Sequence, residues 1–241
     1  MKLPNQMRKT VLRVKYAAIF LVILVFENSC ITKPAPPVIS EPFPQSGFCE
    51  LSDEEIRKFV IELNIVGVSS STAVATFLGG RLFILTNRHN LPEEVAVKNI
   101  TLRNSRYQYS NVDGIIKLGQ DYALEKGLGP ARDYALLVPS KPHIFQPLPL
   151  HFGRHTGKVV IPSYAARVYK VGRGSQWHID DLFDRLDVWL DKGASGAPVI
   201  TCNGEIAGLY TALLRPEDFE RAGFGAISTP VSAIISDLKA K

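Results

Sequence analysis

The stretch Gly193-Ala194-Ser195-Gly196-Ala197-Pro198 lies between two apolar runs typical of β-strands, at 187–190 and 198–201. Glycine adopts backbone angles that other residues avoid, so the stretch predicts a tight turn that exposes the hydroxyl of Ser195. A nucleophile for acyl transfer needs such a hydroxyl, together with backbone N–H groups that face the developing oxyanion. The N–H groups of Gly193 and Ser195 can meet that need. Taken alone, the stretch also fits a glycine-rich hairpin turn.

A serine nucleophile needs a base, and His89 is the best-placed histidine. It follows the apolar run 82–86 through Asn87 and Arg88. A strand that ends in polar residues holds an imidazole rigidly and leaves it accessible at the strand end. The four other histidines lie in Pro-, Gly- or charge-rich surroundings typical of loops; they are His143, His151, His155 and His178.

The base in turn needs a buried carboxylate that fixes its orientation. Asp133 directly precedes the apolar run 134–138, which places it at the edge of a buried strand. Asp121 is the alternative, because the same tetrapeptide DYAL begins there. Its run is interrupted at once by Glu125-Lys126-Gly127, so the pattern favours Asp133.

These three segments resemble those of trypsin-like serine proteases. LTNRH (85–89) is similar to their LTAAH, DYALL (133–137) to their DIALL, and GASGAP (193–198) to their GDSGGP, in the same order. GAISTPV (225–231) resembles the end of compact bacterial members, including HtrA-like protease domains. The resemblance covers about residues 65–240 and implies a double β-barrel with the active site between the barrels.

The resemblance also implies roles for individual residues. Ser195 would be the nucleophile, His89 the general acid and base, and Asp133 the group that orients His89, with the N–H groups of Gly193 and Ser195 as oxyanion hole. The substrate would lie along Thr211-Ala212-Leu213. Trp189 occupies the position at which trypsin has its specificity-determining acid, which argues against cleavage after Arg or Lys; alternatively, it is a core aromatic residue. No metal or cofactor is implied.

Three residues depart from the family pattern. Asn87 and Arg88 replace the usual pair of small residues before the histidine, and the bulky cation of Arg88 would crowd the site or pair with an acid. Ala194 replaces the usual Asp or Asn before the serine. In trypsin-type zymogens that Asp receives the new N-terminus, so Ala194 argues against activation by insertion of an N-terminus.

Short β-rich runs separated by Gly, Pro, Asn and Asp predict an all-β fold. The resemblance sorts them into two six-stranded antiparallel barrels, at about 65–140 and 150–229, within a domain spanning 49–241. The expected strands are 65–68, 72–78, 82–86, 100–103, 115–118, 134–138, 158–161, 166–169, 187–190, 198–201, 206–211 and 225–228. Short helices are expected at each end. The first begins at the Ser52-x-x-Glu55 capping pattern and runs through Leu63, and the last covers 230–239 with Thr229 as its cap.

The N-terminal 30 residues are typical of an export signal. Five basic residues precede the eleven-residue apolar run 16–26, which is too short for a membrane-spanning helix. Cys30 follows the run, so it is either the lipidated cysteine of a lipoprotein or part of a plain signal peptide or anchor. A Pro-rich segment at 31–48 predicts an extended linker. We therefore expect an exported body, tethered to a membrane if Cys30 is lipidated.

The remaining cysteines and the charge add two constraints. Cys49 and Cys202 either form a disulfide in an oxidising compartment or are buried thiols. From Cys30 onward the chain has 23 basic and 22 acidic residues. Such a nearly neutral body offers no surface for binding nucleic acid, so a protein or peptide substrate is expected.

Three functions fit these features unequally. The leading hypothesis is an exported serine endopeptidase that acts through an acyl-enzyme. The alternative is a catalytically silent protein of the protease fold that binds or scaffolds at the cell envelope, for which Arg88 is the main argument. An α/β-hydrolase esterase is disfavoured, because its nucleophile lies in G-x-S-x-G and its triad runs in the order Ser, Asp, His.

Overall fold

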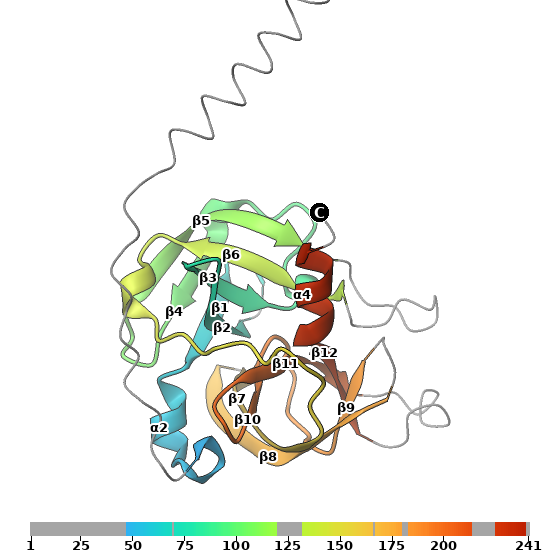
Figure 1. Cartoon of the computed structure of the whole chain (residues 1–241). Coiled ribbons are helices and arrows are strands. Elements are labelled where there is room, and N and C mark those ends of the chain that lie inside the picture. Colours follow the sequence, from blue (N-terminus) through green and yellow to red (C-terminus); the bar gives the residue numbers. More distant parts are fainter. Residues whose placement is uncertain are drawn as a thin grey trace, which may run out of the picture. The chain divides into compact units, whose positions relative to one another are not determined.

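The structure of the chain is a computed structural model that describes residues 47–68, 70–119, 132–165, 167–179, 183–213 and 225–239, apart from the side chains of 117 and 118. Its strands form two closed barrels of six strands each, with antiparallel pairing throughout. Figure 1 shows β1–β6 in one barrel and β7–β12 in the other. The predicted all-β class and double barrel are therefore confirmed.

The first barrel has the order β1-β2-β3-β6-β5-β4. Its strands are β1 (Val60–Ile65), β2 (Ser71–Leu78), β3 (Arg81–Thr86), β4 (Ile100–Arg103), β5 (Tyr109–Leu118) and β6 (Ala135–Pro139). Strands β3 and β6 pair with Thr86 opposite Ala135. Because β3 ends where β6 begins, this register brings residues 87–90 next to residue 133.

The second barrel has the order β10-β11-β12-β9-β8-β7. Its strands are β7 (Gly157–Ala165), β8 (Val168–His178), β9 (Asp184–Leu186), β10 (Pro198–Thr201), β11 (Ile206–Leu213) and β12 (Ala226–Pro230). Pro198 at the start of β10 lies opposite Leu209 of β11. The loop that carries Ser195 therefore enters β10 beside the second half of β11.

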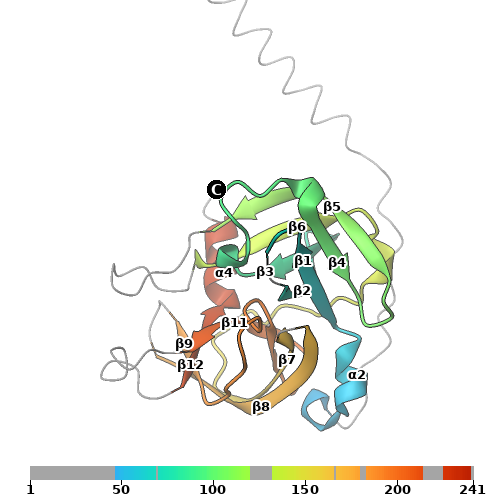
Figure 2. The same cartoon turned by 180° about the vertical axis from the view of Figure 1, so that it is seen from behind.

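Three apolar clusters hold these elements together. One fills the first barrel and includes Leu63, Ile84 and Leu137. Another fills the second barrel and includes Ile161 and Val199. The third joins the barrels: it contains Val74, Leu85 and Leu136 from the first, Val160, Ile200 and Leu209 from the second, and Val231 and Ile234 from helix α4 (Val231–Lys239). Figures 1 and 2 both show α4 leaving the second barrel and lying against the first.

The first predicted helix is too long. Ser52 and Glu55 form the expected capping box, in which Glu55 N donates to Ser52 Oγ (3.4 Å) and Ser52 N donates to Glu55 Oε2 (2.9 Å). Helix α2, however, covers only Asp53–Arg57, and Val60 already begins β1. Residues 60–65 are almost wholly buried, so their apolar pattern fits a strand as well as a helix.

Other boundaries also differ. The predicted strand at 187–190 is wrong: strand β9 ends at Leu186, and Val188 and Leu190 are buried in the second barrel's core without belonging to a strand. The predicted cap of the last helix is also wrong. Thr229 belongs to β12, and its hydroxyl bonds to Thr211 and to the carbonyl of Asp133.

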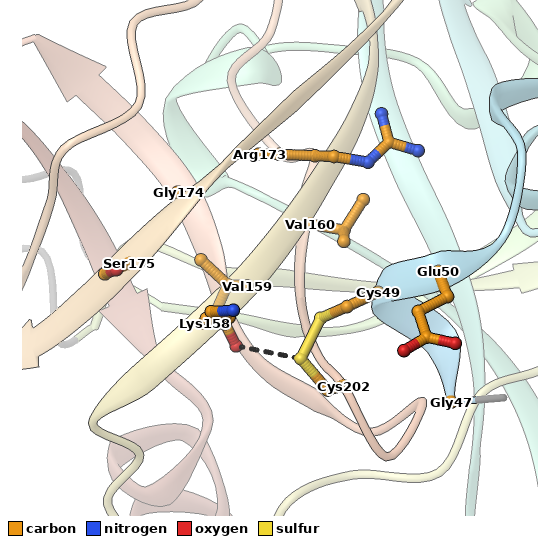
Figure 3. A pocket seen from close by; sticks show the side chains of 10 residues that line it. All are labelled: Gly47, Cys49, Glu50, Lys158, Val159, Val160, Arg173, Gly174, Ser175 and Cys202. Carbon is orange, nitrogen blue, oxygen red and sulfur yellow. Dashed lines mark hydrogen bonds between the residues drawn. A yellow bond between two sulfur atoms is a disulfide. The ribbon is translucent and has the colours of Figure 1, made fainter.

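Cys49 and Cys202 form a disulfide at a sequence separation of 153, as one of the two interpretations expected. It attaches the 3-10 helix η1 (Phe48–Glu50) to the turn after β10. The N–H of Phe48 also donates to the carbonyl of Cys202 (2.7 Å). The two cysteines line a pocket of about 500 Å³ together with Lys158 and Arg173 (Figure 3).

No helix in the described ranges is both long enough and apolar enough to span a membrane. Residues 1–46, including Cys30 and most of the expected linker, lie outside the described residues.

Candidate active site

His89 and Asp133 meet at the end of the first barrel at which β3 ends and β6 begins. His89 lies in the 3-10 helix η2 (Arg88–Asn90), which directly follows β3, and Asp133 lies two residues before β6. The ring nitrogen Nδ1 of His89 is 2.6 Å from Asp133 Oδ2, and the backbone N–H of His89 donates to Oδ1 (3.0 Å). Both carboxylate oxygens therefore hold the same residue, which fixes the orientation of the imidazole. Asp133 is fully buried, whereas the side chain of His89 is 28% exposed.

The loop that carries Ser195 contains two glycines with left-handed backbone angles. Gly193 has φ 98° and Gly196 has φ 84°, a region that other residues rarely adopt. A Cβ atom at Gly196 would overlap the carbonyl oxygen of Thr72 and the hydroxyl of Thr86. The predicted tight turn is thus packed directly against the first barrel.

Hydrogen bonding among the described residues leaves two N–H groups of the segment 193–197 unused. Ala194 N donates to Asp191 O (3.1 Å), Gly196 N to Tyr210 O (2.9 Å) and Ala197 N to Ala194 O (2.9 Å). Within the described part of the chain, the N–H groups of Gly193 and Ser195 have no hydrogen-bond acceptor. The hydroxyl of Ser195 donates to the carbonyl of Thr211 in β11 (2.9 Å).

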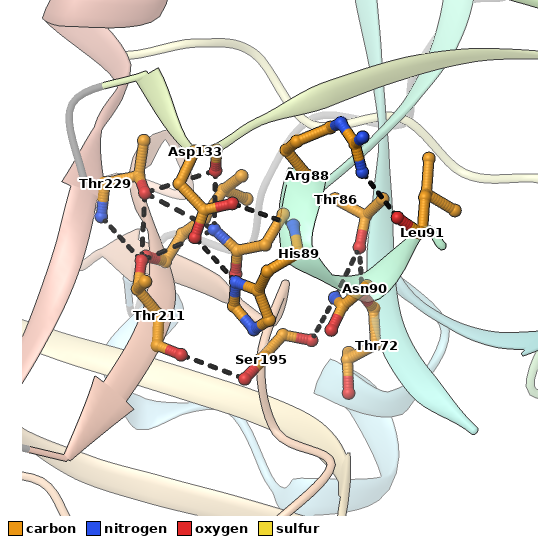
Figure 4. A network of polar contacts seen from close by, with 12 residues as sticks. Thr72, Thr86, Arg88, His89, Asn90, Leu91, Asp133, Ser195, Thr211 and Thr229 are labelled. Carbon is orange, nitrogen blue, oxygen red and sulfur yellow. Dashed lines mark hydrogen bonds and ion pairs between the residues drawn. The ribbon is translucent and has the colours of Figure 1, made fainter. Parts of the chain in front are cut away.

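Residues of the first barrel hold the backbone of the loop that carries Ser195 (Figure 4). Asn90, next to His89, donates through Nδ2 to the carbonyl of Ser195 (2.9 Å), and the N–H of Thr72 reaches the same oxygen (3.2 Å). Thr72 Oγ1 donates to the carbonyl of Gly193 (3.2 Å). These contacts bring Ser195 to the same seam between the barrels as His89 and Asp133.

The other candidate residues differ in how exposed they are. Trp189 is 49% exposed, so the alternative that it is a core aromatic is wrong. Thr211 is fully buried with its hydroxyl hydrogen-bonded, whereas Ala212 is partly and Leu213 largely exposed. Arg88 donates through Nη1 to the carbonyl of Leu91. Asp121, the rival of Asp133, lies outside the described residues.

Two of the other histidines also have carboxylate partners. His151 Nδ1 lies 2.8 Å from Glu205, and His178 Nδ1 lies 2.9 Å from Asp184. His178 is the last residue of β8 rather than part of a loop, which corrects the prediction. Burial raises the pKa of Asp184, against the opposing effect of hydrogen bonds from His178 and Gln176.

The sequence marks Asn87 as a departure from the family pattern but assigns it no role, whereas the structure places its side chain beside Asp133. Asn87 is fully buried, and its amide reaches Asp133, Thr211 and Thr229. Its place next to the predicted base was visible in the sequence. Its partners were not, because they lie 46 (Asp133), 124 (Thr211) and 142 (Thr229) residues away in sequence. The described residues contain no cluster of His, Cys, Asp and Glu suited to a metal ion.

No model of a known protein family matches the sequence, and no curated protein matches it either. Several solved structures, however, are similar to this chain. A serine endoprotease from Yersinia pestis aligns with a TM-score of 0.57 at 18% identity, over 78% of this chain and 65% of that protein. The protease Rv3671c in an inactive form aligns with a TM-score of 0.56 at 15% identity, over 77% of this chain and 90% of that one. A serine-to-alanine mutant of Rv3671c from Mycobacterium tuberculosis gives 0.57 at 14%, over 83% and 94%. The chain thus has the chymotrypsin-like fold of these serine proteases.

Proposed function

We propose that this chain is an exported serine endopeptidase that cleaves peptide bonds through an acyl-enzyme, with Ser195 as nucleophile, His89 as general acid and base, and Asp133 as the residue that orients His89. The observation that carries the proposal is the contact of His89 with both oxygens of the buried Asp133, in a fold in which Ser195 lies at the same seam. A buried carboxylate bound to Nδ1 of the base holds the imidazole in the orientation that a serine nucleophile needs and stabilises its protonated form.

The mechanism follows from the donors and acceptors present. With Nδ1 of His89 bound to Asp133, the other ring nitrogen, Nε2, accepts the proton of Ser195 as Oγ bonds to the carbonyl carbon. The negative charge moves to the carbonyl oxygen. The carbon–nitrogen bond then breaks, and His89 returns the proton to the leaving amine. Water repeats the sequence on the acyl-enzyme, which releases the acid and restores Ser195.

The two unused N–H groups support this assignment. Among the described residues nothing accepts from the N–H groups of Gly193 and Ser195, so both can donate to the oxyanion, while the intervening N–H of Ala194 donates to the carbonyl of Asp191. Preorganised donors of this kind lower the barrier because they need no rearrangement when charge develops. The hydroxyl of Ser195 must turn from the carbonyl of Thr211 towards His89 to react.

The second candidate is a catalytically silent protein of the same fold. The bond from Ser195 Oγ to the carbonyl of Thr211 favours it, because that bond occupies the nucleophile's hydrogen. A fluorophosphonate probe reacts only with an activated serine, so it separates the two candidates.

Labelling of the full-length protein provides the test. We expect time-dependent labelling of the wild type, none of Ser195→Ala, and a loss of several orders of magnitude in kcat on a casein-type substrate for that variant. A wild type that folds but neither reacts with the probe nor cleaves protein would favour the silent candidate.

We further propose that residues 1–30 direct export and that Cys30 carries a lipid, so that the protein is tethered to a membrane of the cell envelope. Metabolic labelling with a radioactive fatty acid checks this. Incorporation into the wild type and not into Cys30→Ser is expected, and equal incorporation in both would exclude lipidation at Cys30.

A further inference from the structure

Asn87 is a fully buried amide at the junction of the two barrels. It directly follows β3 and lies two residues before His89. Its Nδ2 donates to the carbonyl of Asp133 (2.7 Å) and lies 3.3 Å from the hydroxyl oxygens of both Thr211 and Thr229. Asp133 belongs to the first barrel, whereas the threonines lie on β11 and β12 of the second. One side chain therefore connects both barrels beneath the triad.

The threonines extend this connection to both ends of the triad. Their hydroxyls bond to each other (2.9 Å), and that of Thr229 also reaches the carbonyl of Asp133 (3.3 Å). The backbone carbonyl of Thr211 accepts the hydroxyl of Ser195 (2.9 Å). The cluster thus touches the peptide that bears the acid and the strand residue that contacts the nucleophile, as Figure 4 shows for the labelled Asp133, Thr211 and Thr229.

The orientation of the Asn87 amide is fixed by chemistry. A carbonyl cannot donate, so the atom 2.7 Å from the oxygen of Asp133 must be the NH₂ group. The amide oxygen is then buried, and no described residue donates a hydrogen bond to it. Unpaired buried acceptors lower stability, and in native structures they often occur at functional sites. The contacts of Asn87 therefore suit the placement of Asp133 better than they suit stabilisation of the fold.

We propose that Asn87 is a positioning residue: it holds the peptide of Asp133 against β11 and β12, so that the carboxylate keeps its two contacts with His89. This inference rests on the proposed serine-protease function. In the described part of the chain, the carbonyl of Asp133 accepts hydrogen bonds from Asn87 and Thr229. Without Asn87, only the longer bond from Thr229 would remain.

The test uses the full-length chain and compares Asn87→Ala with Asn104→Ala. Asn104 is also a buried asparagine with two amide bonds, to the carbonyl of Ile144 and to Gln108 (2.8 Å each), but it lies between β4 and β5. We expect Asn87→Ala to lower kcat about 10- to 100-fold, as misplacement of catalytic groups does. KM should stay within about twofold, and the rate of fluorophosphonate labelling should fall with kcat. Asn104→Ala should lower the melting temperature and leave kcat unchanged.

A second variant keeps the proposal testable if Asn87→Ala does not fold. Thr229→Val keeps the shape of the side chain and removes its hydroxyl, so it should lower kcat several-fold with little change in KM. Combined with Asn87→Ala, its effect should be non-additive, since both act on the carbonyl of Asp133. Wild-type kcat in Asn87→Ala, or in Thr229→Val where Asn87→Ala does not fold, would overturn the proposal. An unreactive wild type would instead refute the protease function itself.

Discussion

Gly196 is the residue on which the position of Ser195 depends most directly. Its positive φ of 84° allows the loop to turn, and its missing side chain lets the loop approach Thr72 and Thr86 of the first barrel. That approach allows Thr72 and Asn90 to hold the carbonyl of Ser195. A single glycine therefore allows both the turn itself and its close approach to the first barrel.

Gly196→Ala should displace the loop that carries Ser195. We expect the free energy of unfolding to fall by about 2–5 kcal/mol, from left-handed strain and overlap together. Fluorophosphonate labelling should become too slow to detect. Gly79→Ala is the matched control, because Gly79 also has a positive φ (58°) but has no atom within 4 Å of an added Cβ. It should cost only about 1–2 kcal/mol and leave labelling unchanged. Chemical denaturation measures both; equal losses in the two variants would contradict the packing argument.

For single residues of the candidate site, the sequence predicted the features that depend on neighbouring residues and not those that depend on distant ones. The turn around Ser195 follows from its glycines, and the strand end at His89 follows from the apolar run before it. The contacts of Asn87 and Asn90 could not be predicted. Each amide reaches groups more than 40 residues away in sequence, and only the closure of the barrels brings those groups within hydrogen-bond distance.

Among the elements, strands with clear turn signals were predicted well, and buried segments with mixed patterns were not. Strands β4 and β10 have the predicted bounds. In residues 60–65, Val60 and Leu63 continue the helical spacing of Ile56 and Phe59, whereas Ile61, Leu63 and Ile65 alternate as in a strand, so helical and extended spacing both fit them. Segment 187–190 is apolar because Val188 and Leu190 fill the second barrel, yet it lies outside the strands. Burial produced the apolar pattern in both cases, and pairing decided the structure.

The disulfide joins two elements that are far apart in the chain. It attaches η1 to the turn between β10 and β11, at a sequence separation of 153. Such a long closed loop restricts the unfolded chain strongly. The free energy of unfolding of the double variant Cys49→Ser/Cys202→Ser should therefore be about 2–5 kcal/mol lower than that of the wild type. Denaturant titration measures the difference. A reductant should lower the stability of the wild type and leave that of the double variant unchanged; a wild type insensitive to reduction would show that the bond contributes little.

In the whole molecule, the candidate site exists only when the barrels are docked. His89 and Asp133 come from the first barrel, and Ser195 and the unused N–H groups come from the second. The apolar cluster shared by both barrels and α4 keeps these halves in contact. Agents that weaken this interface should thus abolish labelling of Ser195 at the same point at which the protein unfolds.

Tyr210 links the stability of the whole molecule to alkaline pH. Burial raises its pKa to about 12; the hydrogen bond with the backbone of Leu190 opposes this rise, and the charge of Asp191 adds to it. Below pH 10 both states are protonated and the contribution to stability is complete. Between about pH 10 and 12 the unfolded chain loses its proton first, so the free energy of unfolding falls as pH rises, by about 3 kcal/mol from this group.

Denaturant titrations across this range should show a smaller decline for Tyr210→Phe than for the wild type. Tyr109→Phe, at an exposed position, should follow the wild type. Equal declines for the wild type and Tyr210→Phe would contradict a buried, protonated Tyr210 in the folded state.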